Sequence, residues 1–406
     1  MSHALVNRSP DLKRLRDEGY AIEVIKPAYL VVRNVPYMNS NREIKYGILV
    51  SELNLAGDVT TKPETHVIHF AGEQPCHKDG TVIVQLVHQN NLQKLGGIDV
   101  QRSFSNKPRP TGYDDYYEKI STYVKVISSP AQSSDNNVHA QTFSVIETAE
   151  EESVFRYLDT ASSRAGIDEV TKKLEVGKIA VIGVGGTGSY VLDLVAKTPP
   201  KEIHIFDGDK QLQHNAFRAP GAPSLEELKK QGPKVQYFAE IYSRMRRNIF
   251  AHNCFIDASN VDRLKGMNFV FICVDKGSVK KLIIEKLEEW GIPFIDVGMG
   301  IEKVDTSLTG ILRVTTSTPD YKGHVEKRIS FDENDPEGIY DQNIQLADLN
   351  ALNAALAVIK WKKILGFYHD SEKEHNSTYS INCNLLTSDE KPEAPEFDAD
   401  EEKVEA

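Results

Sequence analysis

The stretch KIAVIGVGGTGS, residues 178–189, decides the fold of the second half of the chain. Residues 179–182 form an apolar run typical of a buried strand, and SYVLDLVAKT (189–198) has the pattern of a helix. Between them lie the glycines Gly183, Gly185, Gly186 and Gly188. Glycines here let the backbone turn tightly and approach a phosphate, while the helix N-terminus supplies N–H donors. The stretch predicts a nucleotide-binding loop, whose usual ligand is a dinucleotide.

Strands and helices alternate from this strand onward, over some 200 residues. Such alternation is the signature of a doubly wound parallel sheet. We therefore predict an α/β fold, a Rossmann-like doubly wound sheet, preceded by a smaller α+β domain. The predicted strands are EIHIFDGD (202–209), NFVFICVD (268–275), IPFIDVGMG (292–300) and LTGILRVTTST (308–318), and the predicted helices are KVQYFAEIYSRMR (234–246), VKKLIIEKLEEWG (279–291) and ADLNALNAALAVIKWKKILGFY (347–368).

Changes in composition along the chain suggest three regions. Residues 1–150 mix short β-type runs with turn-forming residues and a tyrosine-rich stretch, GYDDYYEKISTYVKVI, which favours a compact α+β accessory domain. The polar segment SSPAQSSDNNVHAQ (128–141) is expected to be an exposed loop near its end. Residues 151–386 form the predicted α/β domain. Residues 387–406 are acidic and lack large apolar residues, so we expect a disordered tail.

The composition of the chain bears on which partners it can bind and where in the cell it is found. The net charge of -11 argues against binding to nucleic acid through phosphate contacts. No run of about 18 apolar residues and no signal-peptide pattern occurs, so we expect neither a membrane span nor export, and we predict a cytoplasmic protein. The four cysteines are widely spaced and form no C-x-x-C pair, so they are expected to be free thiols.

A set of charged and polar residues follows the glycine loop. Two acidic residues end the second strand, where a carboxylate can accept from ribose hydroxyls, as in a dehydrogenase. An asparagine, two cations and a third carboxylate come later, and cations can neutralise the phosphates of ATP while a carboxylate holds Mg²⁺. Hydride transfer needs no such set. The residues are Asp207, Asp209, Asn215, Arg218, Lys234 and Asp275.

Together, GVGGTGS, D-x-D-x5-N-x-x-R, the downstream lysine and the CVD strand end resemble the ThiF/MoeB superfamily. This superfamily includes ubiquitin-activating enzymes and the adenylyltransferases of thiamine and molybdopterin biosynthesis. The resemblance covers roughly residues 155–385 and implies that ATP and Mg²⁺ bind, with adenosine along the glycine loop. It places Asp209 on the ribose and Asp275 on magnesium. The implied phosphate ligands are Asn215, Arg218 and Lys234.

The resemblance also implies an arginine just before the first strand, often donated by the partner subunit of a dimer. Arg164 in TASSRAG is the candidate, with Arg156 as the weaker one and a solvent-facing arginine as the alternative. The resemblance implies a homodimer, and the apolar helix predicted over 347–368 is consistent with one. The N-terminal domain resembles an uncharacterised domain found ahead of this module in bacterial proteins, which suggests recruitment of a partner.

The sequence departs from the family in its cysteines. Many relatives bind zinc through two C-x-x-C pairs, which are absent here, so no zinc is expected. Residues 310–360 contain no cysteine, so the thiol that forms a thioester in ubiquitin-activating enzymes is missing. Three alternatives remain. The enzyme could stop at the acyl-adenylate, use a hydroxyl as nucleophile with His324 as base, or use the thiol of Cys76 as nucleophile. Cys273 lies in an apolar run and is expected to be an inert core thiol. The candidate hydroxyls, for which strand-end and loop roles are the alternative, are Thr315, Thr316, Ser317 and Thr318.

The leading prediction is adenylation of the C-terminal carboxylate of a ubiquitin-like protein, as the first step of a conjugation pathway with a downstream conjugating enzyme. Activation of a sulfur-carrier protein for cofactor synthesis is the nearest alternative, and the extra N-terminal domain favours conjugation. An NAD-dependent oxidoreductase and a catalytically idle scaffold are two further hypotheses. In the family the acceptor tail passes beneath a crossover segment, here about residues 315–345, whose glycines and prolines suit a mobile cover.

Overall fold

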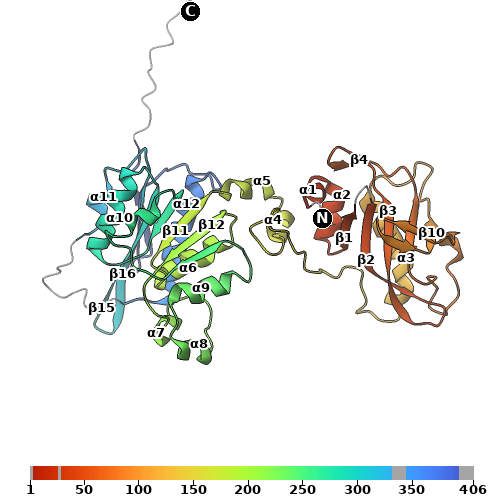
Figure 1. Cartoon of the computed structure of the whole chain (residues 1–406), viewed down its shortest axis with the longest axis horizontal. Coiled ribbons are helices and arrows are strands. Elements are labelled where there is room, and N and C mark those ends of the chain that lie inside the picture. The colour runs from red at the N-terminus through yellow and green to blue at the C-terminus, as the bar shows by residue number, and fades with distance from the viewer. Residues whose placement is uncertain (1–2, 26–28, 332–343, 393–406) are drawn as a thin grey trace, which may run out of the picture. The chain divides into compact units, whose positions relative to one another are not determined.

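The computed structural model describes residues 3–25, 29–331 and 344–392. The chain forms two compact units (Figure 1). Unit 1 comprises Met1–Ile146 and Thr160–Gly166, and unit 2 comprises Glu147–Asp159 and Ile167–Ala406.

Unit 1 is built on an antiparallel sheet in the order β1-β2-β3-β6-β10-β7. Its strands are β1 (Ala21–Ile25), β2 (Tyr29–Met38), β3 (Ile44–Glu52), β6 (Val67–Ala71), β7 (Val87–Gln89) and β10 (Arg102–Ser105), with two short pairs, β4 (Leu55–Ala56) with β5 (Val59–Thr60) and β8 (Gln93–Leu95) with β9 (Ile98–Val100). Its helices are α1 (His3–Arg8), α2 (Pro10–Asp17), α3 (Tyr116–Gln132) and α4 (Thr160–Ala165), with the 3-10 turn η1 (Val84–Leu86).

Helix α3 packs on this sheet and supplies much of the core. It begins at Asp115, whose side chain accepts a hydrogen bond from the backbone N–H of Glu118. Its tyrosines Tyr116 and Tyr123 and the preceding Tyr113 are buried, so the tyrosine cluster is core packing. The helix continues to Gln132 through Pro130, so the predicted loop over 128–141 was wrong in its first five residues.

Lys119 on α3 is buried, and its ammonium donates to Ser51 Oγ and to the carbonyl of Thr65, both at 2.9 Å. Burial lowers its pKa from 10.5 to about 8. Below pH 8 the Lys119 amine is protonated in both the folded and the unfolded chain, so the folded protein bears the full cost of burying the charge. Between pH 8 and 10.5 the folded chain loses this proton before the unfolded chain does, so the free energy of unfolding rises.

Relative to Lys119→Met, the wild-type protein should therefore gain about 2 kcal/mol in the free energy of unfolding between pH 8 and about pH 9.5. Urea unfolding of both proteins, followed by circular dichroism, measures the difference and cancels the other titrating groups. An equal change in both proteins over this range would contradict the assignment.

Helix α4 belongs to unit 1 because it packs against α2. The guanidinium of Arg16 donates to Ser163 Oγ, and it also pairs with Asp17 at 3.1 Å. Arg16 and Ser163 are both buried. This contact ties the segment that precedes the α/β domain in the sequence to the N-terminal unit.

Unit 2 contains an eight-stranded sheet in the order β13-β12-β11-β14-β15-β16-β17-β18. The first five strands in this order are parallel, and the last three are antiparallel to their neighbours. The strands are β11 (Lys178–Ile182), β12 (Glu202–Phe206), β13 (Ile249–His252), β14 (Phe269–Ile272), β15 (Phe294–Val304), β16 (Ser307–Ser317), β17 (Asn376–Ser380) and β18 (Leu385–Asp389). The helices are α5 (Asp168–Thr171), α6 (Gly186–Ala196), α7 (Gln213–Ala216), α8 (Leu225–Lys230), α9 (Lys234–Tyr242), α10 (Gly277–Glu289), α11 (Val325–Arg328) and α12 (Ala347–Ile364), with the 3-10 turns η2 (Lys172–Leu174) and η3 (Val261–Leu264).

Helices cover both faces of this sheet. Helices α6, α9 and α12 pack on one face, around Val181, Phe271 and Trp361. Helix α10 packs on the other, against Ile182 and Ile272. The strand order reverses between β11 and β14, because the chain runs from β11 outward to β13 and then returns to the other side of β11. Ligands of such sheets bind at the carboxyl ends of the strands at this switch point. The predicted fold class is confirmed.

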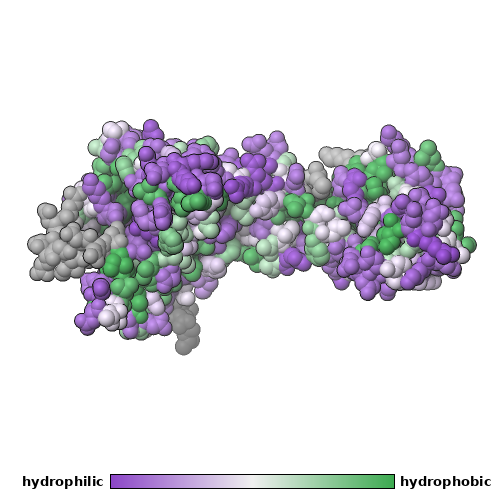
Figure 2. Space-filling view, turned by 90° about the horizontal axis from the view of Figure 1, so that it is seen from below, coloured by the Kyte–Doolittle hydropathy of each residue, from purple (hydrophilic) through white to green (hydrophobic). Residues whose placement is uncertain are grey.

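The antiparallel end of the sheet was not predicted beyond β16. The tail was expected to begin at residue 387, but β18 continues to Asp389 because its backbone pairs with β17, Asn376 lying opposite Asp389. Residues 393–406 lie outside the described residues. None of the helices in the described parts is long and apolar enough to cross a membrane. In Figure 2, hydrophilic residues cover most of the face in view.

Candidate active site

The glycine loop joins β11 to α6 at the switch point. Gly183 has a φ of 83°, and a Cβ there would lie 2.8 Å from the carbonyl oxygen of Cys273 at the end of β14. A Cβ on Gly188 would lie 1.9 Å from the Gly183 oxygen, so both positions require glycine. A Cβ on Gly185, by contrast, would meet no atom within 4 Å. The loop is tight on its protein side and open at Gly185, where a phosphate can approach the backbone.

Asp207, one residue past β12, holds this loop in place. Its side chain is buried, and one carboxylate oxygen accepts from the Val184 N–H at 3.0 Å while the other accepts from the Asp209 N–H at 2.8 Å. Asp209 is the more exposed of the two carboxylates. The geometry assigns Asp207 to the support of the loop and leaves Asp209 to face a ligand.

Lys234 opens α9 and neutralises this acidic pair. Its side chain is buried, its Nζ lies 2.7 Å from Asp209 Oδ2 and 3.9 Å from Asp207 Oδ1, and its backbone N–H donates to the Asp209 carbonyl. The ammonium therefore sits beside the ends of β12 and the glycine loop. An anionic ligand would find a cation already fixed there.

The segment from α7 to Arg218 holds two buried donors that have no hydrogen-bond partner among the described residues. Asn215 is buried; its Oδ1 accepts from the Leu212 N–H at 2.9 Å, while its Nδ2 has no hydrogen-bond partner among the described residues. Three residues later, the Nε of Arg218 is buried and likewise without a hydrogen-bond partner in the described parts of the chain. Buried donors are normally satisfied, so an orphaned pair indicates an acceptor that the protein alone does not supply.

Asp275 is exposed and follows β14, directly across the switch point from the glycine loop. The next helix begins at Gly277, where a Cβ would lie 2.5 Å from the carbonyl oxygen of Phe331. A Cβ on Gly186 would lie 2.4 Å from Gln345 Oε1. The described ends of the crossover thus lie at the first turns of α10 and α6, on either side of the switch point. Residues 332–343 of the predicted cover lie outside the described residues.

The profile of the ThiF family matches residues 159–403, which is more than half of the chain. The chain belongs to the ThiF family. ThiF proteins form an E1-like family of adenylyltransferases and bind ATP, so the predicted resemblance is confirmed and the oxidoreductase hypothesis is not retained. Residues 10–160 match a second profile, described as a domain of unknown function, DUF6791. No curated protein matches the chain.

Several solved structures are similar to this ThiF domain. The Escherichia coli protein MccB with ATP is 16% identical, with a TM-score of 0.45, over 56% of this chain and 67% of that one. MccB with MccA-N7isoASN is 15% identical, with a TM-score of 0.46, over 58% of this chain and 70% of that one. PaaA is 17% identical, with a TM-score of 0.43, over 57% of this chain and 80% of that one. Likeness at this level concerns the fold alone.

Asn350 is a residue of the ThiF domain that sequence reasoning missed. It lies on α12 and is fully buried. Its Oδ1 accepts from Thr187 Oγ1 at 3.0 Å, and its Nδ2 donates to the Arg218 carbonyl at 3.1 Å. One side chain thus ties the first turn of α6 to the loop that holds Arg218. The only signal in the sequence was an asparagine inside an apolar helix.

Phe255 is a second residue that the sequence did not reveal. Its side chain is 62% exposed, yet the edge of its ring packs on Gly208, where a Cβ would lie 2.6 Å from two ring carbons. Gly208 stands between the two acidic residues at the end of β12. An exposed aromatic ring beside Gly208 offers a face on which a base can stack. An isolated phenylalanine after a short strand carries no such signal in the sequence.

Phe255→Ala should raise the KM for ATP by roughly fivefold to tenfold and leave kcat nearly unchanged, because a stacking contact serves ground state and transition state alike. ATP–pyrophosphate exchange at varied ATP measures both constants. Phe250→Ala, which removes another exposed aromatic ring after β12, is the control. Equal effects of the two changes on KM would contradict a contact between the base and Phe255.

The two candidate arginines belong to different units of the chain. Arg164 is on α4 in unit 1, and its guanidinium carbon lies 5.7 Å from the ring centroid of Phe143. Arg156 belongs to unit 2 and donates through Nε to the Ser243 carbonyl at 2.6 Å, which is a structural role. Arg164 therefore stays the candidate of the two.

The hydroxyl run is at the wrong edge of the sheet. Ser317 pairs with Phe294, the first residue of β15, whereas the glycine loop and Asp275 lie at the carboxyl edge. Thr315, Thr316 and Ser317 are buried in β16. The nearest histidine ring nitrogen to Thr318 Oγ1, at 3.5 Å, is that of His375. These residues are structural.

The structure does not support a catalytic role for the histidine and the thiols considered from the sequence. His324 is buried, its Nε2 bonds the Thr316 carbonyl at 2.9 Å, and burial lowers its pKa. Cys76 is fully buried, and burial raises the pKa of its thiol, so the hypothesis of an exposed and activated thiol was wrong. Burial also raises the pKa of Cys273, as expected for an inert core thiol.

Proposed function

We propose that the ThiF domain adenylates the C-terminal carboxylate of a ubiquitin-like protein, using ATP and Mg²⁺. The observation that supports this most is the orphaned pair of donors, Asn215 Nδ2 and Arg218 Nε, on a turn beside a glycine loop that is open at Gly185. A polyphosphate has acceptors for both donors and would lie next to the ammonium of Lys234.

In the proposed reaction a carboxylate oxygen of the acceptor tail attacks the α-phosphorus of ATP. A new P–O bond forms, the bond to the β-phosphate oxygen breaks, and pyrophosphate leaves with the electron pair. Arg218 and Lys234 neutralise the charge that develops on the phosphates, and Asp209 accepts from the ribose hydroxyls. Mg²⁺, when bound, would neutralise charge on the phosphates, and Asp275 would hold it.

The residues present fit this metal. Mg²⁺ keeps several waters and needs only one or two protein carboxylates beside the phosphates, and Asp275 is exposed at the switch point. Among the described residues no three His, Cys, Asp or Glu side chains gather as a metal cage would require. A single exposed carboxylate beside the glycine loop is sufficient to bind a Mg²⁺ ion that the phosphates also coordinate.

We further propose that the enzyme acts as a homodimer and that Arg164 completes the site of a second copy. The acyl group would then pass to a downstream conjugating enzyme, because Cys76 is buried, burial raises the pKa of Cys76 and Cys273, and residues 310–360 contain no cysteine. A separate N-terminal unit favours conjugation over activation of a sulfur carrier for cofactor synthesis.

ATP–pyrophosphate exchange tests the proposal. Candidate ubiquitin-like proteins and sulfur-carrier proteins are offered with a free C-terminus, and each is offered again with an amidated C-terminus as the matched control. Exchange that requires the free carboxylate of a ubiquitin-like protein is the expected result. Exchange with sulfur carriers alone would replace the substrate class. Exchange that does not distinguish free from amidated tails would overturn the reaction itself.

A further inference from the structure

Strand β3 of unit 1 is only half paired. Strand β2 pairs with both ends of β3, from Tyr29 opposite Glu52 to Met38 opposite Ile44, with an irregularity between Val32 and Val35. Strand β6 pairs with it only from Ile48 to Val50. Among the described residues the first four residues of β3, 44–47, therefore have a strand neighbour on one side only. At about 3.3 Å per residue this open edge is about 13 Å long.

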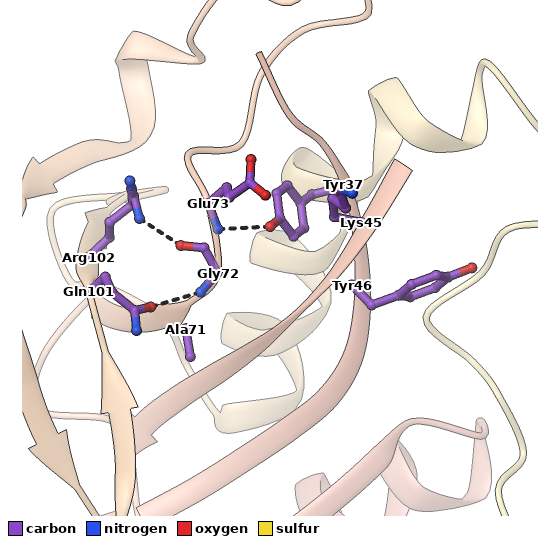
Figure 3. Close-up of a pocket in the computed structure, with 8 residues that line it drawn as sticks. All are labelled: Tyr37, Lys45, Tyr46, Ala71, Gly72, Glu73, Gln101 and Arg102. Carbon is purple, nitrogen blue, oxygen red and sulfur yellow. Dashed lines mark hydrogen bonds between the residues drawn. The ribbon is translucent and has the colours of Figure 1, made fainter. Parts of the chain in front are cut away.

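A cavity of about 580 Å³ lies at this open edge (Figure 3). It exists because the chain leaves β6 at Gly72, where the Glu73 N–H donates to the hydroxyl of Tyr37 at 2.8 Å. Lys45 and Tyr46 both line it, although successive residues of a strand point to opposite faces of the sheet. The cavity thus continues the plane of the sheet. We call it the β3 slot.

The backbone of Tyr46 is directed into the β3 slot. The Phe70 carbonyl accepts from the Gln101 N–H at 3.1 Å, so the backbone N–H and C=O of Phe70 point toward β10. Adjacent residues of a strand direct these groups to opposite neighbours, so those of His69 and Ala71 point toward β3. The β3 partner of Ala71 is Ile48, which must then face β6. Alternate residues face the same neighbour, so Tyr46 faces the β3 slot.

The pairing of Tyr46 with β2 supports this orientation. Its partner on β2 is Pro36, which has no N–H and cannot form a doubly hydrogen-bonded pair. The N–H and C=O of Tyr46 are thus available to an added strand. Its side chain is 58% exposed and would lie against that strand.

Arg102 gives one end of the β3 slot a fixed positive charge. Its Nη1 donates to the Gly72 carbonyl at 2.6 Å and its Nε donates to Gln74 Oε1 at 3.1 Å, and both of these acceptors are neutral oxygens. At the other end, Lys45 is already paired with Glu43 at 3.1 Å. The guanidinium is held in place and forms no ion pair within the described residues. The carboxylate of Glu73 also lines the β3 slot, but it accepts from Asn39 Nδ2 at 3.0 Å, which leaves the guanidinium to a carboxylate of a ligand.

We propose that the β3 slot binds an extended segment of a partner protein, which pairs with the backbone of Tyr46 and places an acidic side chain against Arg102. Strand addition at a sheet edge supplies main-chain hydrogen bonds, and the charged pocket supplies specificity. This inference goes beyond adenylation and does not depend on it, because it concerns unit 1.

The test uses the full chain and a set of capped hexapeptides of alternating valine and threonine, with one glutamate at each successive position. Fluorescence polarisation measures binding. One glutamate position should bind best, Arg102→Ala should weaken that peptide about tenfold, and Arg102→Glu should prefer the peptide with lysine at the same position. Arg109→Ala, which removes another partly exposed arginine of unit 1, is the matched control.

The backbone contact is tested on the peptide alone, so the protein stays intact. N-methylation of the peptide nitrogen that faces β3 should reduce binding by about tenfold, and methylation of the next nitrogen should not. Failure of every peptide to bind at millimolar concentration would overturn the proposal. So would binding that is equal for the glutamate and lysine series, or equally weakened by Arg102→Ala and Arg109→Ala.

Discussion

Asp275→Ala is expected to lower the rate of ATP–pyrophosphate exchange by roughly 100- to 1000-fold. The proposed role of Asp275 is to hold the Mg²⁺ that neutralises the departing pyrophosphate, and no other residue at the end of β14 offers a carboxylate. The side chain is exposed. Exchange is measured with saturating ATP and acceptor at several Mg²⁺ concentrations.

Two comparisons separate a metal ligand from a residue that merely contributes charge. Asp275→Asn keeps the shape but weakens metal binding, so raising the Mg²⁺ concentration should restore part of its activity and none of that of the alanine variant. Asp262→Ala removes an exposed carboxylate of η3 and should match the wild type. An Asp275→Ala protein that retains more than about a tenth of the exchange rate would exclude the proposed role.

The part of the site that the sequence predicted is the part fixed by local chemistry. Gly183 has a φ of 83° and a Cβ on Gly188 would meet the Gly183 oxygen, so both glycines are required within a strand–turn–helix unit that is contiguous in the sequence. The carboxyl ends of parallel strands meet at one edge, so the end of β14 could be placed beside the loop once the alternation of strands and helices was recognised.

The rest depends on contacts between distant segments. Asn350 acts through Thr187 and the Arg218 carbonyl, which are 163 and 132 residues away in the sequence. Strands β17 and β18 were missed because their residues are mostly polar or exposed, so their pattern resembles a loop. The hydroxyls of β16 are candidate nucleophiles in the sequence because nothing in it shows that β16 runs antiparallel to β15.

Unsatisfied polar groups distinguish the two kinds of residue in the site. Asp207 bonds two backbone N–H groups, and Lys234 is ion-paired, so both have partners within the folded chain. Asn215 Nδ2 and Arg218 Nε are buried and have none among the described residues. Groups of the first kind contribute to stability, whereas groups of the second kind cost stability until a ligand satisfies them.

Arg218→Gln should therefore lower exchange by about 100-fold without lowering the free energy of unfolding of the apo protein. The lost guanidinium has no partner at Nε in the described residues to leave unpaired. Thermal unfolding with and without ATP measures stability and ligand binding together. The wild type should gain stability with ATP, and the variant should gain much less.

Lys234→Met is the matched contrast. It removes a cation from beside Asp209 and Asp207, so it should reduce exchange to a similar extent and also lower the free energy of unfolding by about 1–3 kcal/mol. A loss of stability in Lys234→Met but not in Arg218→Gln, with similar losses of activity, would identify Arg218 as a residue that the ligand completes and Lys234 as one that the fold also needs. A loss of stability in Arg218→Gln as large as that in Lys234→Met would refute the distinction, because it would mean that the fold itself uses the guanidinium.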